Sequence, residues 1–514
     1  MVFRLLKFFL LTIIFPSVLK AQNETVTTTY GIVQGDVNPS GIRVFKGIPF
    51  AAPPVGSLRW KAPQPPAKWE GVRKCDQFGP SAMQAKPAPF MYWSSEFLIP
   101  ESPISEDCLY LNVWTGSKNG KDKRPVIVWI HGGGFRGGGA ACPIYDGEAL
   151  AKKGVVFVSI NYRVGVFGFL AHPDLTKESD SHSSGNYALL DMIAALKWVQ
   201  QNIAAFGGNP NNVTIEGQSA GAFAVNYLMA SPLAKGLFHR AIAQSGGAML
   251  ANPAIPASSL KSAEEMGIKY AEAIKAQSLE EMRSKSADDI LKTQGPSGPI
   301  IDGYVIPEDL YSIFSKGLQN DVPLLAGWNE DDLVGAQPLS AAAFKEMASK
   351  RFGDMAGAYL DAYPANTDEE AKESVNHSSR DEIFGSQVFT WAQIQEKTGK
   401  SKVWLYHFSR KLPAYNEKSK FGAFHSSEIV YAFNNLKTLH RPWEPSDQKL
   451  ADLMSNYWVN FANYGNPNSR TVPMWTEFNP KEEVLVVFDE VPHPERLNGK
   501  VQLNFWQKYY HPSK

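Results

Sequence analysis

Short, almost entirely apolar segments alternate along this chain with longer amphipathic ones. The clearest amphipathic stretch covers residues 187–206, where large apolar side chains recur every three or four positions and form one stripe. Short apolar runs without polar alternation are typical of strands that are buried on both faces. The pattern therefore predicts an α/β fold with a mostly parallel central sheet flanked by helices on both faces. The apolar runs are residues 126–130, 155–161, 213–216, 241–244, 322–326 and 403–408.

Size and charge narrow the class of protein further. The 514 residues, 44% of them hydrophobic, supply enough apolar material for a large core. No Pro-, Gly- or Ser-rich tract, charge block or repeat divides the chain, so we expect residues 22–514 to form one domain. The formal net charge is 0, and removing residues 1–21, with three basic and no acidic residues, leaves −3. This balance argues against a nucleic-acid partner.

The N-terminal segment, residues 1–21, has the pattern of a secretory signal peptide. Arg4 and Lys7 precede an apolar run, and Ala21 is the expected cleavage position. An uncleaved membrane anchor is the alternative, but about 12 apolar residues interrupted by Pro16 fall short of the roughly 20 that span a bilayer. We expect a secreted or periplasmic protein without stable membrane insertion.

Three cysteines, Cys75, Cys108 and Cys142, are an odd number for a chain that is expected to enter an oxidising compartment. One disulfide between Cys75 and Cys108, with one free thiol, is the simplest interpretation. No Cys/His spacing resembles a zinc site, and no metal is expected.

A candidate nucleophile lies in the sequence Gly217-Gln218-Ser219-Ala220-Gly221. The pentapeptide stands between the strand-like run 213–216 and a stretch of helix formers. In a Gly-x-Ser-x-Gly elbow the serine occupies a sharp strand-to-helix turn, and glycines are needed where side chains would collide with neighbouring backbone. Sites in parallel sheets form at the carboxyl ends of strands, which is where Ser219 is placed.

A second motif, His131-Gly132-Gly133-Gly134-Phe135, follows the run 126–130 directly. A run of glycines lets backbone amides approach a developing oxyanion closely. Gly133 and Gly134 are the expected donors, together with the amide of Ala220. A merely flexible turn is the alternative for the loop. Its combination with a serine elbow farther along the chain favours the oxyanion hole.

A serine nucleophile needs a base, and ten histidines are available. His407 lies within the strand-like run 403–408, where a packed histidine is the ordinary interpretation. His425 lies in a loop after that run and before a helical pattern at residues 428–433. It also follows Ser219 in the chain, as the order serine, acid, histidine requires.

The acid of such a site should follow another strand between Ser219 and His425. After the run 322–326 come Glu330, Asp331 and Asp332. One of these carboxylates could orient the histidine and stabilise its imidazolium form. Local reasoning does not choose among the three.

Several longer motifs resemble the type-B carboxylesterases, a family of α/β-hydrolases that includes cholinesterases and bacterial para-nitrobenzyl esterases. The similarity runs from about residue 31 to about residue 506. The motifs that carry it are residues 45–56, 105–112, 131–135, 161–165, 206–210 and 217–221.

This resemblance implies roles for particular residues. His425 is the implied base and Asp332 the implied acid, although most relatives carry glutamate at that position, which keeps Glu330 as an alternative. Arg59 with Glu106, and Arg163 with Asp191, are implied to be buried structural ion pairs. The family's N-terminal disulfide would use Cys108, but its partner position is occupied here by Ala82.

The resemblance also implies a serine carboxylesterase that acts on small-molecule esters without a cofactor. Two positions bear on the substrate: Gln218 replaces the family's usual glutamate, and Ser297 lies in residues 295–299, where cholinesterases place bulky acyl-pocket aromatics. We expect a roomier acyl side. A lipase or an aryl or feruloyl esterase of the same fold is the nearest alternative, and a non-catalytic adhesion module is a more distant one.

Overall fold

A computed structural model describes residues 24–251, 253, 258–332, 337–417, 420–497 and 499–511. The segment 1–21, expected to be a signal peptide, lies outside these residues. Within them, thirteen strands form one large sheet in the order β1-β2-β3-β7-β9-β8-β10-β11-β12-β13-β14-β15, with β4 beside β2. The strands are β1 Glu24–Thr27, β2 Ile32–Val37, β3 Arg43–Pro49, β4 Val72–Lys74, β7 Tyr110–Thr115, β8 Arg124–Ile130, β9 Val156–Ile160, β10 Gly208–Gln218, β11 Arg240–Gln244, β12 Leu324–Asn329, β13 Val403–Phe408, β14 Val484–Phe488 and β15 His493–Arg496.

The centre of the sheet is parallel, and its two margins are antiparallel. Seven neighbouring strands, from β9 through β8 and β10 to β14, run in the same direction. The antiparallel pairs lie among β1, β2, β3, β7 and β9 at one side and between β14 and β15 at the other. The predicted α/β fold with a mostly parallel sheet is therefore confirmed.

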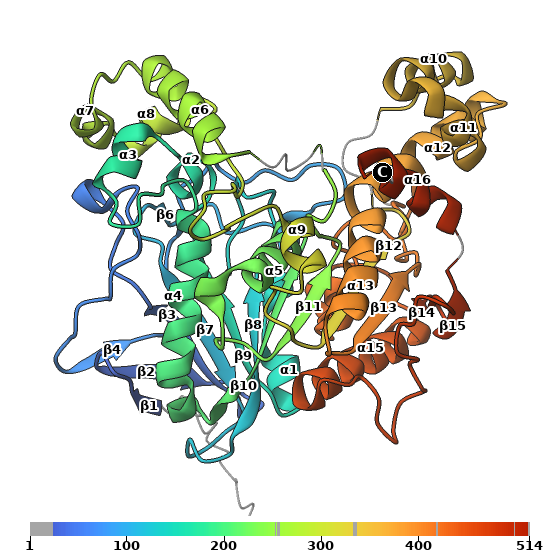
Figure 1. The fold of residues 1–514 in the computed structure, drawn as a ribbon. Helices are drawn as coiled ribbons and strands as arrows, with labels where there is room; N and C mark the ends of the chain where they lie inside the picture. The colour runs from blue at the N-terminus through green and yellow to red at the C-terminus, as the bar shows by residue number, and fades with distance from the viewer. Residues whose placement is uncertain are drawn as a thin grey trace, which may run out of the picture.

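Helices cover both faces of the sheet (Figure 1). Because successive side chains of a strand point to opposite faces, Val126, Val128 and Ile130 of β8 pack in one core, and Ile127 and Trp129 in another. The first core also contains side chains of α4, α5 and α13, and the second contains those of α1, α14 and α15. The bounds are α1 Glu148–Lys152, α4 Tyr187–Asn202, α5 Ala220–Ala230, α13 Ser386–Thr398, α14 Ile429–Ala432 and α15 Pro445–Tyr464.

Two further groups of helices lie apart from each other at the top of the view in Figure 1. One group comprises α6 Leu260–Ala273, α7 Leu279–Ser284 and α8 Ala287–Leu291. The other comprises α10 Ala341–Phe352, α11 Ala356–Ala362 and α12 Asp368–Arg380, with α16 Lys500–Tyr510 beside it. Shorter helices are α2 Gly165–Phe169, α3 Pro173–Glu178 and α9 Leu310–Ser315. Among the helices of the described ranges, none has the length and apolar character needed to cross a membrane.

The predicted elements differ from the observed ones mainly at their ends. The run 322–326 becomes β12 Leu324–Asn329, since Pro323 has no N–H to donate to a neighbouring strand. The amphipathic stretch 187–206 is α4 followed by a 3₁₀ turn, Ile203–Phe206, which ends at Gly207 with a φ of 86°. Glycine adopts this left-handed conformation without strain.

The predicted disulfide between Cys75 and Cys108 is wrong, because all three cysteines are free and buried. The N–H of Cys75 donates to the carbonyl of Gln34, and its own carbonyl accepts from Lys46, both at 2.7 Å. These bonds hold Cys75 between β2 and β3. A spacing in sequence does not bring two thiols to bonding distance, and here each thiol packs in the apolar core instead.

The two predicted ion pairs are confirmed. Arg163 donates from Nε and Nη2 to the two carboxylate oxygens of Asp191 at 2.8 and 2.7 Å. Arg59 contacts Glu106 in the same bidentate way, with both distances 2.6 Å. Bidentate geometry satisfies the charges of buried partners, which suits a structural role.

Candidate active site

Ser219 occupies a strained turn between the end of β10 and the start of α5. Its φ of 56° and ψ of −126° are unusual for a residue with a side chain. Its N–H donates to the carbonyl of Gln244 at 2.9 Å, which ties the turn to the end of β11. The side chain is half-buried, and within the described residues its hydroxyl makes no hydrogen bond. The turn therefore presents a hydroxyl that is free to meet a ligand.

The two glycines of the elbow are required by backbone packing. A Cβ atom on Gly221 would overlap the carbonyl oxygen of Ile130, and one on Gly217 would overlap the backbone of Gly221. A Cβ on Gly246, after β11, would lie 2.7 Å from the carbonyl oxygen of Ser219. The turn is thus closed tightly against two neighbouring strands, which fixes the direction of the serine side chain.

His425 and Asp332 meet at the same edge of the sheet. His425 Nδ1 lies 2.5 Å from Asp332 Oδ1, and the other carboxylate oxygen, Oδ2, accepts the N–H of Asn329 at 2.9 Å. Both side chains are almost completely buried. Because a carboxylate only accepts, the proton of the neutral imidazole resides on Nδ1, which leaves the lone pair of Nε2 available to take a proton.

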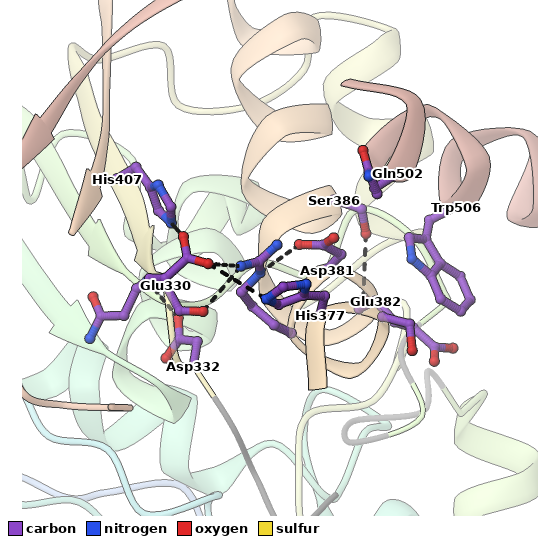
Figure 2. Close-up of polar contacts among 12 residues, drawn as sticks. Glu330, Asp332, His377, Asp381, Glu382, Ser386, His407, Gln502 and Trp506 are labelled. Carbon is purple, nitrogen blue, oxygen red and sulfur yellow. Dashed lines mark hydrogen bonds and ion pairs between the residues drawn. The ribbon is translucent and has the colours of Figure 1, made fainter. Parts of the chain in front are cut away.

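Glu330, the alternative acid, is directed elsewhere. Its carboxylate contacts Arg380 Nη1 at 3.0 Å and His407 Nε2 at 3.2 Å. Figure 2 shows Glu330 between His407 and His377, with Asp332 beside it. The third acid, Asp331, accepts the N–H of Ala423 at 2.8 Å. Of the three consecutive carboxylates, Asp332 is the one that the structure brings to His425.

The glycine loop lies directly against the elbow. A Cβ on Gly132 would be 3.1 Å from the Cβ of Ser219, and Gly133 and Gly134 have φ values of 114° and 61°. Glycine adopts these left-handed conformations readily. No acceptor in the described part of the chain takes the amide N–H of Gly133, Gly134 or Ala220. Three unengaged amides next to a serine are the arrangement that an oxyanion hole needs.

Gln218 lies over the ring of His425. Its Nε2 is 3.3 Å from one ring nitrogen and 3.5 Å from the other. An atom nearly equidistant from both nitrogens in the plane of the ring would overlap the carbon between them. The carboxamide therefore contacts a face of the imidazole rather than either in-plane lone pair, a weak N–H···π contact.

Glu428 is a second buried carboxyl at this site, and sequence reasoning missed it. Its oxygens accept from Asn329 Nδ2 at 2.5 Å and from Gln244 Nε2 at 3.2 Å. Burial, with Asp332 nearby, raises the pKa of Glu428 to about 7. The available signal was its place three residues after His425, at the start of a predicted helix. Asn329 thus links Glu428 to the carboxylate that holds His425.

The other predicted pocket residue, Ser297, is half-buried and makes no hydrogen bond to Ser219 or His425 among the described residues. In its segment, a Cβ on Gly295 would meet Val166 and Tyr270. Pro299, farther along, lines a cavity of about 230 Å³ with Met249 and other apolar side chains. No group of three or more potential metal ligands occurs in the described ranges.

A parallel sheet with a strained serine elbow, a histidine–carboxylate pair and free glycine amides at one edge defines an α/β-hydrolase of the serine type. Comparisons with known proteins agree: the model of the carboxylesterase family matches residues 22–506. The chain belongs to this family, and it is a carboxylic ester hydrolase.

Individual relatives show how far the similarity extends. The fumonisin B1 esterase of Sphingopyxis macrogoltabida is 39% identical over 486 residues, 90% of this chain and 86% of that protein. The para-nitrobenzyl esterase of Bacillus subtilis (strain 168) is 35% identical over 502 residues, 91% of this chain and 96% of that protein. The crystal structure of a Geobacillus stearothermophilus carboxylesterase aligns with a TM-score of 0.80 at 31% identity, covering 94% of this chain and all of that one.

Proposed function

We propose that the chain is a secreted or periplasmic serine carboxylesterase in which Ser219, His425 and Asp332 form a catalytic triad. The observation that carries the proposal is the 2.5 Å contact between His425 and Asp332, together with a serine in a strained turn whose neighbour Gln218 contacts the His425 ring. Localisation rests on the signal-peptide pattern of residues 1–21 alone.

Hydrolysis would proceed in two steps. His425 Nε2 takes the proton of Ser219 as the hydroxyl attacks the ester carbonyl, and Asp332 stabilises the imidazolium that forms. The amides of Gly133, Gly134 and Ala220 hold the oxyanion. The alcohol leaves with the proton from His425, and water then releases the acid by the same sequence. The chain supplies every group that these steps need.

Substitution of Ser219 tests the assignment. We expect Ser219→Ala to lose covalent labelling by a fluorophosphonate probe and to lower kcat for a 4-nitrophenyl ester by at least about 10³-fold. Ser231→Ala is the matched control, since Ser231 lies at the other end of α5 and its buried hydroxyl has no partner in the described residues. Normal turnover by Ser219→Ala would refute the triad.

The acyl side of the site is proposed to accept more than acetyl groups. The apolar cavity near Pro299 is also lined by Ala248, Met249 and Leu250, which follow the glycine that packs against Ser219. A series of esters with lengthening acyl chains should show kcat/KM rising beyond acetyl. Cleavage of acetyl esters alone would contradict this. Activity on emulsified long-chain triglyceride would indicate a lipase instead.

A further inference from the structure

The helical segment that packs against His425 contains an unusual wide turn. Between α12 and α13, residues Asp381–Gly385 form a π-helical turn, in which the N–H of Ser386 donates to the carbonyl of Asp381. Such turns are rare, occur mostly as single turns within α-helices, and are frequently found at functional sites. The carbonyl of Glu382 is taken instead by side chains, Gln387 Nε2 at 3.3 Å and Ser386 Oγ at 3.5 Å. The sequence therefore stabilises a wide turn that an ordinary α-helix would lack.

The wide turn carries the ring that contacts the base. Phe384 is buried, and its ring stacks on the imidazole of His425 with centroids 4.7 Å apart and planes inclined by 21°. Trp93 lies perpendicular to the same imidazole, with ring centroids 6.1 Å apart and planes inclined by 88°. Since a stacked ring allows sliding but prevents tilting, Phe384 restricts the orientation of the His425 ring.

Arg380, the residue just before the turn, binds the loop that carries Asp332. Arg380 Nη1 donates to the carbonyl oxygen of Glu330 at 3.1 Å and to its carboxylate at 3.0 Å. Burial disfavours the charged form of Glu330, but Arg380, with His407 and His377, lowers the pKa of this carboxyl below its ordinary value. The pair is therefore ionised, and it fixes backbone two residues before Asp332.

Arg380 is itself connected to the C-terminal helix α16 through hydrogen bonds. Arg380 Nε donates to Asp381 at 2.8 Å, and Asp381 accepts the hydroxyl of Tyr363 at 3.0 Å. Trp506 of α16 donates its indole N–H to the same hydroxyl at 2.9 Å. In Figure 2, Asp381 lies between Glu330 and Glu382, and Glu382 lies on the side of Trp506. A continuous chain of polar contacts thus joins α16 to the acid loop.

We infer that the π-helical turn and the residue just before it position the groups of this site: Phe384, in the turn, holds the ring of His425, and Arg380, before the turn, holds the loop that carries Asp332. Phe384 and Arg380 are positioning residues, since they act through the base and the acid. The inference rests on the proposed catalytic roles of these two residues. It assigns to the helical segment a function that packing alone does not require.

Phe384→Leu tests the contact with His425, because leucine keeps apolar volume but removes the flat ring. Active sites are counted by fluorophosphonate labelling, so that unfolded protein does not contribute to kcat. We expect kcat per labelled site to fall about 10-fold for a 4-nitrophenyl ester with KM nearly unchanged, as for a small misplacement of a catalytic group. Unchanged kcat per labelled site, or a change in KM alone, would overturn the inference.

Phe389→Leu is the matched control, since Phe389 is equally buried on α13 but its ring packs against Phe478. It should lose stability while keeping kcat per labelled site. If it lost kcat as Phe384→Leu does, the effect would be one of general packing and the inference would fall.

Arg380→Lys tests the contact with the loop that carries Asp332, and it is available if Phe384→Leu does not fold. Lysine keeps the charge, but its single ammonium group cannot replace the planar guanidinium that contacts the carboxylates of Glu330 and Asp381 at the same time. We expect a similar fall in kcat per labelled site. Arg351→Lys is its control, because Arg351 pairs with Glu382 on the other side of the same turn. Full kcat in Arg380→Lys would overturn the inference, whereas an active Ser219→Ala would overturn the proposed triad.

Discussion

His425 Nδ1 and Asp332 Oδ1 are 2.5 Å apart, and 93 positions of sequence separate the two residues. The carboxylate is held from its other side by the N–H of Asn329 at the end of β12. A short, buried, charge-assisted hydrogen bond of this kind fixes both the tautomer and the direction of an imidazole.

Asp332→Asn should abolish most of the activity without unfolding the protein. Asparagine keeps the size of the side chain, but its amide favours the wrong tautomer of His425, and a loss in kcat on the order of 10⁴-fold is expected by analogy with serine proteases. Steady-state kinetics on a 4-nitrophenyl ester would measure it. Asp331→Asn, at the neighbouring acid, should keep most of its kcat. Equal losses in both variants would exclude a special role for Asp332.

Gly221→Ala should prevent the elbow from forming. The added methyl would overlap the carbonyl oxygen of Ile130 in β8, and backbone in the centre of a sheet cannot move away cheaply. We expect little soluble, folded protein on expression. The yield of soluble protein, circular dichroism and thermal melting would measure this loss.

Gly357→Ala provides the contrast for this substitution. Gly357 lies in α11, and a methyl group added there would have no neighbouring atom within 4 Å. Alanine at this position should be neutral or should stabilise the helix by about 0.5–1 kcal/mol. A folded, active Gly221→Ala protein would contradict the tight closure of the turn.

Glu216 should make stability fall with rising pH. This carboxyl is fully buried in β10, with Trp458 Nε1 donating to it at 2.9 Å, and burial raises its pKa from 4.5 to about 8 despite that bond. The native protein keeps a proton that the unfolded chain loses between these values. The free energy of unfolding therefore decreases through this window and levels off above it.

Glu216→Gln removes this titration. Relative to the variant, the wild-type protein should lose about 4 kcal/mol of unfolding free energy between about pH 5 and pH 8.5, at roughly 1.4 kcal/mol per pKa unit. Urea denaturation at both pH values measures the difference. Parallel pH profiles for the two proteins would show that Glu216 titrates normally.

The three cysteines should all be thiols in the purified protein. Unfolded protein that has not been reduced should react with three equivalents of a thiol reagent, and folded protein should react slowly. Burial raises the pKa of Cys75 to about 12, so its nucleophilic thiolate is scarce. Cys142→Ala should leave two equivalents. A single equivalent in the wild-type protein would indicate the disulfide that the structure lacks.

Local physical chemistry was enough to predict much of this molecule. All six apolar runs became strands, because continuous burial on both faces of a sheet leaves a pattern in adjacent residues. The elbow at Ser219 could be predicted for a similar reason. Glycine is needed at positions 217 and 221 because a side chain at either would overlap neighbouring backbone. The boundaries of β12 and α4 were less accurate because they depend on single residues, Pro323 and Gly207.

Distances between remote segments were decided by the tertiary structure. Three adjacent acids are equivalent in the chain, and only packing turns Asp332 toward His425 and Glu330 toward Arg380. The position of Phe384 was also decided by the tertiary structure. Its stacking on His425 depends on a wide helical turn that the periodicity of apolar residues does not predict. Residue patterns encode burial and local backbone geometry, whereas the meeting of side chains across the sheet edge follows from how whole elements pack.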